Sequence, residues 1–71
     1  MMLVCQLVER DGQLLFDGKP LRDGDWLQLL VYDGLRNRVV WIDTQVLHCE
    51  DGVWCAVGAL GYQLNGLFAR L

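Results

Sequence analysis

Apolar and polar side chains alternate along several short runs of this chain. In one run, Leu27, Leu29 and Val31 point to one side of an extended backbone, and the residues between them point to the other. A period of two residues is typical of a β-strand with one buried face. By this criterion the sequence predicts strands at 3–9, 13–16, 25–32, 38–49, 53–57, 62–64 and 67–71.

Glycine-containing dipeptides separate these runs and leave no uninterrupted segment for a long helix. Such pairs adopt positive φ angles readily and favour tight hairpins. The sequence therefore predicts one all-β domain over residues 1–71, built as a small barrel or a rolled antiparallel sheet of roughly five to seven short strands. A two-residue turn at 65–66 would pair Leu64 with Leu67 in a last hairpin. The dipeptides are Asp-Gly at 11–12, 17–18, 23–24, 33–34 and 51–52, and Asn-Gly at 65–66.

Two segments carry a resemblance to known proteins. The stretch 17–29, DGKPLRDGDWLQL, places a Gly-Asp pair before an alternating strand, and 66–70 reads Gly-Leu-Phe-Ala-Arg. Both resemble small SH3-like β-barrel proteins of uncharacterised bacterial families. The resemblance implies an SH3-like barrel. Because those families lack an assigned activity, it implies no function.

Size and composition predict an apolar surface. The chain has 71 residues, of which 54% are hydrophobic, against roughly 45–50% in typical soluble domains. A domain this small has too much surface to bury so much apolar material. Part of it is therefore expected to face a partner protein or a second copy of the chain.

Net charge and cysteine content narrow the expected partners and the expected cellular location. The net charge of −3 argues against a duplex-binding module, which usually carries a basic stripe. Most acidic residues lie in or beside the glycine turns, where Asp side chains bond to the backbone. The first residues lack a basic signal-peptide start, and no apolar run is long enough to span a membrane. We therefore expect a cytoplasmic protein with free thiols and no membrane contact.

One cluster could hold a metal. Cys5, His48, Cys49 and Cys55 would supply the four ligands of a zinc-stapled domain. No Cys-x-x-Cys spacing supports this alternative, so we expect neither a metal nor a cofactor. The turn decides the thiol geometry: a two-residue loop at 51–52 puts Cys49 and Cys55 on opposite faces, and a three-residue loop at 50–52 puts them on one face.

The sequence contains no pattern that predicts a catalytic site. Neighbouring positions in a strand point to opposite faces, so His48 and Cys49 cannot form a dyad. The chain has no serine, and its glycines are dispersed singly among turns rather than gathered in a phosphate-binding loop. We therefore expect a protein that is not an enzyme.

The aromatic residues indicate a contact surface. If Leu27, Leu29 and Val31 are buried, then an apolar stripe faces outward; if the assignment is reversed, the aliphatic stripe is exposed instead. Either case favours a protein–protein interaction module that self-associates as a homodimer or docks on a partner. The partner-binding residues predicted by the first case are Trp26, Leu30, Tyr32 and Trp41.

Two further hypotheses concern the partner. Small acidic proteins of this kind also occur as phage or mobile-element inhibitors of a host protein, an association with size and charge alone. The alternative from another class is single-stranded nucleic-acid binding, in which aromatic rings stack on bases and Arg36 and Arg38 contact the phosphates. The acidic balance of the chain argues against nucleic acid.

Overall fold

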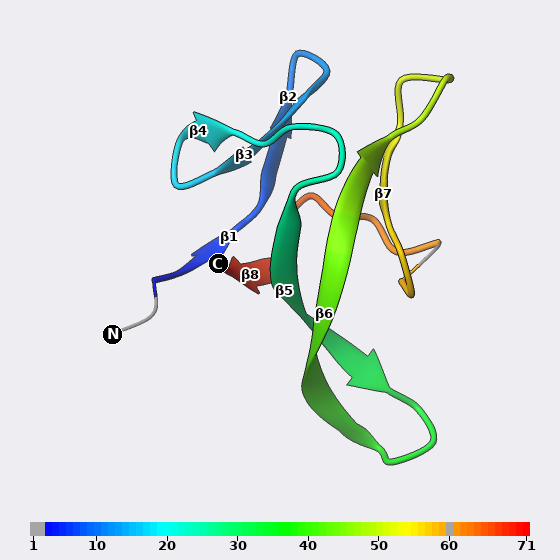
Figure 1. Cartoon of the computed structure of the whole chain (residues 1–71). Helices are drawn as coiled ribbons and strands as arrows, with labels where there is room; N and C mark the ends of the chain where they lie inside the picture. Colours follow the sequence, from blue (N-terminus) through cyan, green and yellow to red (C-terminus); the bar gives the residue numbers. More distant parts are fainter. Residues whose placement is uncertain (1–2, 60) are drawn as a thin grey trace.

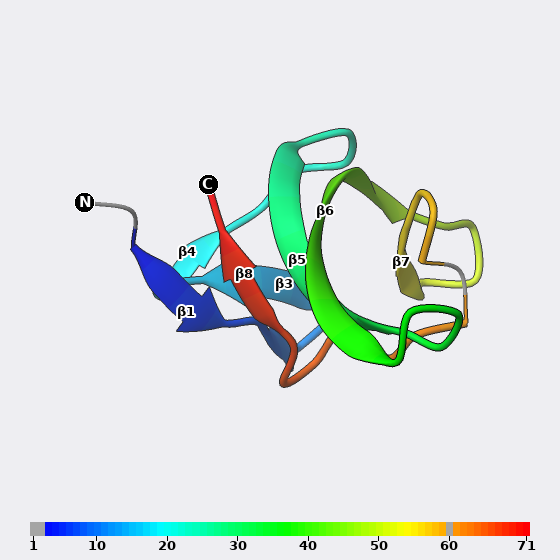
Figure 2. The same cartoon turned by 90° about the horizontal axis from the view of Figure 1, so that it is seen from below.

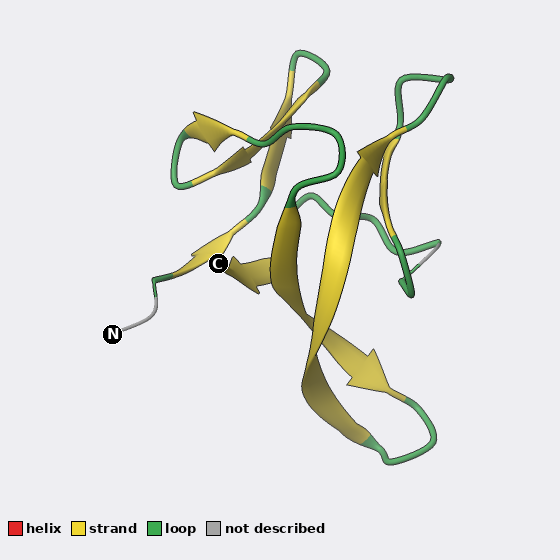
Figure 3. Cartoon of the chain, in the orientation of Figure 1, coloured by secondary structure: helices red, strands yellow, loops and turns green. Residues whose placement is uncertain are grey.

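The computed structural model describes residues 3–59 and 61–71, and these residues form eight β-strands and no helix. The all-β prediction is confirmed (Figure 3). Within this part of the chain there is accordingly no helix long and apolar enough to span a membrane. The strands are β1 (Val4–Gln6), β2 (Val8–Arg10), β3 (Gln13–Phe16), β4 (Lys19–Pro20), β5 (Trp26–Asp33), β6 (Arg38–His48), β7 (Trp54–Ala56) and β8 (Phe68–Arg70).

The strands form two antiparallel sheets (Figure 1). The larger sheet has the order β1-β8-β5-β6-β7, and the smaller has the order β2-β3-β4. The predicted first strand is divided at the buried Leu7, whose amide donates to the carbonyl of Leu67 at 2.8 Å. This division sends β1 into one sheet and β2 into the other. Figure 2 shows the larger sheet curving from β1 round to β7, as expected of a rolled sheet.

One face of the larger sheet closes on the core. Leu27, Leu29 and Val31 are buried, as the first of the two face assignments predicts. Leu29 lies opposite Ile42 on β6 and opposite Ala69 on β8, so three strands contribute to one packed layer. The core comprises Leu7, Leu14, Phe16, Leu27, Leu29, Val31, Val46, Trp54, Ala56, Ala59, Leu64 and Ala69.

Two tight turns fold the smaller sheet. Asp11 and Gly12 both have positive φ angles, 53° and 78°, and join β2 to β3. Asp17 and Gly18 repeat this geometry, at 52° and 75°, between β3 and β4. Positive φ at both central residues is the requirement of a type I′ hairpin turn, which suits Asp-Gly.

The predicted C-terminal hairpin is wrong. Residues 62–64 form no strand, and β8 pairs with β1 and β5 instead. The turn at 65–66 exists, since the Leu67 amide donates to the Leu64 carbonyl at 3.1 Å, but only Gly66 has a positive φ. A turn of that kind does not match the twist of a tight hairpin. The Gly66 amide donates to the Leu7 carbonyl at 2.7 Å. The turn is therefore hydrogen-bonded to the junction between β1 and β2, which is distant in sequence.

Candidate functional site

The larger sheet turns one face away from the core, and this face carries the predicted contact residues. Strand register places Leu30 directly opposite Trp41, and Tyr32 opposite Val39. We call this surface the outer face. It comprises Trp26, Gln28, Leu30 and Tyr32 on β5, Val39, Trp41 and Asp43 on β6, and Phe68 and Arg70 on β8.

Much of the outer face is apolar and open to solvent. Trp26 is 64% exposed, Val39 60%, Tyr32 52% and Phe68 46%. Leu30 and Trp41 are partly buried between them. The four residues predicted from the sequence therefore share one surface. Phe68 and Val39 extend that surface beyond the prediction.

A connected polar group occupies the middle of the outer face. The Arg70 Nε donates to Gln28 Oε1 at 2.6 Å, and the Gln28 amide donates to Asp43 Oδ1 at 2.8 Å. The Arg70 guanidinium also lies 4.1 Å from the centre of the Trp41 ring, a cation–π distance. These contacts link β8, β5 and β6 across the sheet. They also give each of these three polar side chains at least one hydrogen-bond partner among the exposed rings.

Sequence reasoning did not select this polar group. Strand alternation already places Gln28 and Asp43 on the side of Trp26 and Trp41, so that signal was present. Arg70 gave no such signal, because its position follows from the pairing of β8 with β5, 42 residues away along the chain.

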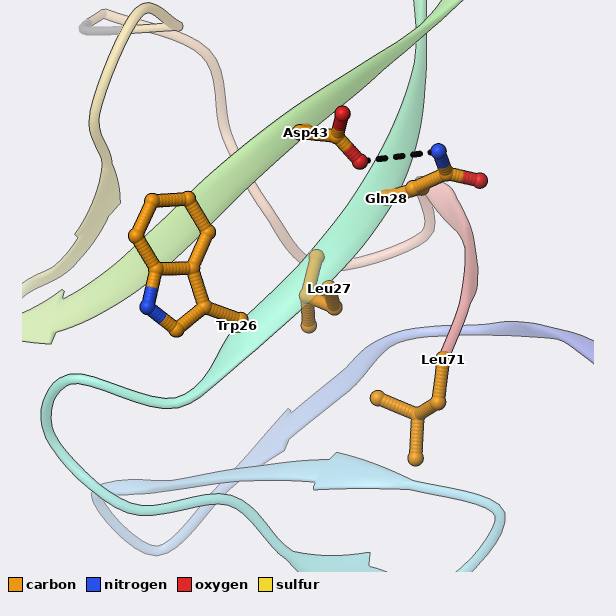
Figure 4. Close-up of a pocket in the computed structure, with 5 residues that line it drawn as sticks. All are labelled: Trp26, Leu27, Gln28, Asp43 and Leu71. Carbon is orange, nitrogen blue, oxygen red and sulfur yellow. Dashed lines mark hydrogen bonds between the residues drawn. The ribbon is translucent and has the colours of Figure 1, made fainter.

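A hollow of about 280 Å³ indents one end of the outer face. Figure 4 shows the Trp26 ring on one side of it and Leu71 on the other, with the hydrogen-bonded Gln28 and Asp43 beside them. Leu27 completes the lining. A recess with an aromatic wall and one polar edge suits an apolar side chain of a protein partner.

Hydrogen bonds hold the other end of the outer face. The Tyr32 hydroxyl donates to Asn37 Oδ1 in the loop between β5 and β6. The Tyr62 hydroxyl donates to the Tyr32 carbonyl at 3.1 Å. Tyr32 is therefore fixed in place although its ring is half exposed. A ring fixed in this way loses little conformational freedom when a partner covers it.

The two arginines of the nucleic-acid hypothesis lie in the loop between β5 and β6 and at the first position of β6. Arg36 forms an ion pair with Asp33 at 3.6 Å in the exposed loop. Arg38 lies opposite Asp33, and alternation puts it on the side of Val40, away from the outer face. The structure instead brings Arg70 to an aromatic ring. That arginine was not among the residues named by the hypothesis, and its Nε also donates to Gln28.

The four candidate metal ligands do not converge either. Cys5 lies on β1 and Cys55 on β7, at opposite ends of the strand order. His48 pairs across the hairpin with Trp54, and their rings stack with centres 4.5 Å apart. Among residues 3–59 and 61–71, no three His, Cys, Asp or Glu side chains are grouped as metal ligands would be.

Cys49 and Cys55 do come together. Leu47 lies opposite Cys55, and the Cys49 amide donates to the Val53 carbonyl at 2.9 Å, which is the three-residue register. The two Sγ atoms are 2.8 Å apart and unbonded. The hydrogen bond with Cys55, followed by partial desolvation and nearby negative charge, raises the pKa of Cys49 to about 11.

None of the protein-family models, curated protein sequences or solved structures compared with the chain matches it.

Proposed function

We propose that this chain is a small, non-enzymatic protein–protein interaction module that binds a second copy of itself through the outer face. The observation that carries the proposal is the gathering of Trp26, Tyr32, Val39 and Phe68, all largely exposed, on one side of one sheet. The proposal includes the SH3-like form of the barrel and a cytoplasmic location, both expected from the sequence.

The chemistry of the outer face supports a protein partner. Trp, Tyr and Arg are the residues most enriched at the centres of protein interfaces, and exposed apolar patches mark such interfaces. Covering a polar group costs free energy when it loses water without gaining a partner. Gln28, Asp43 and Arg70 already bond to one another. Part of the hydrogen-bonding capacity of these side chains is therefore met within the face itself, which lowers the cost of dehydrating it.

Charge and symmetry support a second copy as that partner. Two copies, each with a net charge of −3, repel weakly at physiological ionic strength. The outer face presents one carboxylate, Asp43, and one guanidinium, Arg70, so a two-fold contact can place opposite charges near each other. Two-fold homodimers are the commonest oligomers of soluble proteins.

The test is the solution mass by light scattering, measured on the wild type and on Trp26→Asp. We expect a wild-type dimer and a folded monomeric variant, because a carboxylate on the outer face would be buried without a partner. Leu35→Asp is the matched control: Leu35 is fully exposed in the loop between β5 and β6, outside the outer face. This control adds the same charge and should remain dimeric.

Two outcomes would contradict self-association through the outer face, and a third would favour the alternative function. A monomeric wild type would exclude the second copy and direct the search to a different protein. A Trp26→Asp variant that remains dimeric would place the contact elsewhere on the molecule. Binding to a single-stranded oligonucleotide that weakens steeply with salt would favour the nucleic-acid alternative. Circular dichroism of each variant establishes that it is folded.

A further inference from the structure

The turn end of the β6–β7 hairpin holds two thiols at close range. Cys49 follows β6 and Cys55 lies in β7, and the three-residue loop puts both side chains on one face. Their sulfur atoms are 2.8 Å apart. A disulfide has an S–S length of about 2.05 Å. A movement of about 0.8 Å, within reach of small side-chain rotations, would bring the sulfurs to bonding distance.

We propose that Cys49 and Cys55 are a redox-active pair that a low-molecular-weight disulfide, such as oxidised glutathione, converts into an intramolecular disulfide. The pair lies at the β6–β7 turn, and neither cysteine is among the residues that define the outer face, so this modification site can be tested separately from the proposed self-association.

The reaction is a two-step thiol–disulfide exchange. One protein thiol loses its proton, and its thiolate attacks a sulfur of the reagent, so that a mixed disulfide forms and one reagent thiol leaves. The second protein thiolate then attacks the protein sulfur of the mixed disulfide and expels the other reagent thiol. The protein loses two electrons and two protons, and the reagent gains them as two thiols.

Access and isolation favour these two thiols over other pairings. Cys49 is exposed, so the reagent can reach it directly. Cys55 lines a hollow of about 380 Å³ beside Tyr62 and Glu9, which leaves space for a small molecule. Cys5 lies on β1, at the other end of the strand order, and has no neighbouring thiol there to close a ring with.

A disulfide between Cys49 and Cys55 would close the turn end of the β6–β7 hairpin covalently, where the reduced protein has few backbone hydrogen bonds. Beyond the last paired residues, His48 and Trp54, one backbone bond from Cys49 to Val53 and the turn bond from Gly52 to Cys49 close the hairpin. The Trp54 indole donates to the Gly12 carbonyl at 2.9 Å and so joins this hairpin to the smaller sheet. A covalent closure next to that contact should raise the Tm by about 5–10 °C.

The experiment uses the full chain with Cys5→Ala, so that only the proposed pair can react. We expect oxidised glutathione to give a species about 2 Da lighter, the mass of the two hydrogens lost. That species should resist alkylation, melt at the higher temperature, and revert with dithiothreitol. The variant that also carries Cys49→Ser should instead stop at a mixed disulfide with glutathione on Cys55.

Two results would overturn the proposal. Accumulation of a stable glutathione adduct on the Cys5→Ala protein, with no loss of two hydrogens, would show that the second thiol cannot close the ring. A disulfide-linked dimer on non-reducing gels would show that the thiols pair between chains. Light scattering of the reduced protein tests self-association separately, so failure of either proposal can be recognised without the other.

Discussion

At the residue scale, Thr44 is the buried polar side chain of the described core, with 1% of its surface exposed. Its hydroxyl donates to the carbonyl of Val57, at the end of the β6–β7 hairpin. A hydroxyl in this place satisfies a backbone acceptor that an aliphatic residue would leave unpaired.

Thr44→Val should therefore destabilise the fold by about 1–2 kcal/mol, although the two side chains have nearly the same shape. The cost is the loss of the Val57 hydrogen bond rather than a cavity. Urea unfolding measures it as a lower midpoint with an unchanged slope. Thr44→Ser is the comparison, since it keeps the hydroxyl and removes only a methyl group. A valine variant as stable as the wild type would show that the bond contributes nothing.

The second residue-scale prediction concerns the raised pKa of Cys49. The neutral thiol is held by its hydrogen bond with Cys55, so Cys55→Ala should lower the pKa of Cys49 from about 11 toward the ordinary value of 9.0. At pH 8 the reactive thiolate is then up to about a hundredfold more abundant, and its lower basicity reduces the gain in rate to at most roughly tenfold. The alkylation rate of Cys49 in a Cys5→Ala background measures this, and an unchanged rate would contradict the assigned cause.

The aspartates also show what a sequence can reveal about single residues. Asp33 accepts bonds from the amides of Leu35 and Arg36, and Asp51 accepts one from Val53, which confirms the predicted role of Asp in turns. Asp23 behaves differently. Its carboxylate accepts a bond from the His48 amide, 25 residues away, and no local pattern indicates that partner.

At the element scale, the turns can be tested with a matched pair of glycines. Gly12 has a φ of 78° and its substitution would meet no other atom within 4 Å, so Gly12→Ala isolates the backbone cost. We expect a loss of about 1–2 kcal/mol. Gly34 lies outside the left-handed region, and an added Cβ would contact the Tyr32 ring at 3.9 Å. Gly34→Ala should therefore be neutral or slightly stabilising. Equal thermal melts for the two variants would refute this account.

Strand positions were predictable because their signals are local. Alternation and Asp-Gly turns located β3, β5 and β6 to within a residue or two. The pairing of β8 was not predictable in this way. Its partners, β1 and β5, lie far away in the sequence, and the local Asn-Gly signal at 65–66 favoured a hairpin that does not form.

The outer face likewise combines residues that local sequence signals indicate with residues that only long-range strand pairing brings there. Burial of Leu29 on one side of β5 implies exposure of its neighbours, so alternation alone brought Trp26 and Tyr32 to one surface. Phe68 and Arg70 joined that surface only through the long-range pairing of β8. The sequence therefore indicated the parts of the outer face on β5 and β6. The part on β8 could be located only from the three-dimensional structure.

At the scale of the whole molecule, β8 connects the interior with the outer face. It lies between β1 and β5, so its residues are paired on both edges. Ala69 is fully buried opposite Cys5 and Leu29, whereas Phe68 is 46% exposed on the outer face. Of these two neighbouring residues, Ala69 thus packs in the core and Phe68 lies on the surface.

The last prediction uses these two neighbours. A chain of this length has a stability of about 4–10 kcal/mol, and an unpaired carboxylate in the core costs several kcal/mol. Ala69→Asp should therefore leave the protein largely unfolded, with no cooperative melt by circular dichroism. Phe68→Asp puts the same charge on the outer face, so it should melt cooperatively near the wild-type temperature and behave as a monomer in light scattering. If Phe68→Asp unfolds as Ala69→Asp does, the outer face is part of the folded core and not a contact surface. If Phe68→Asp remains folded and dimeric, the two copies meet elsewhere.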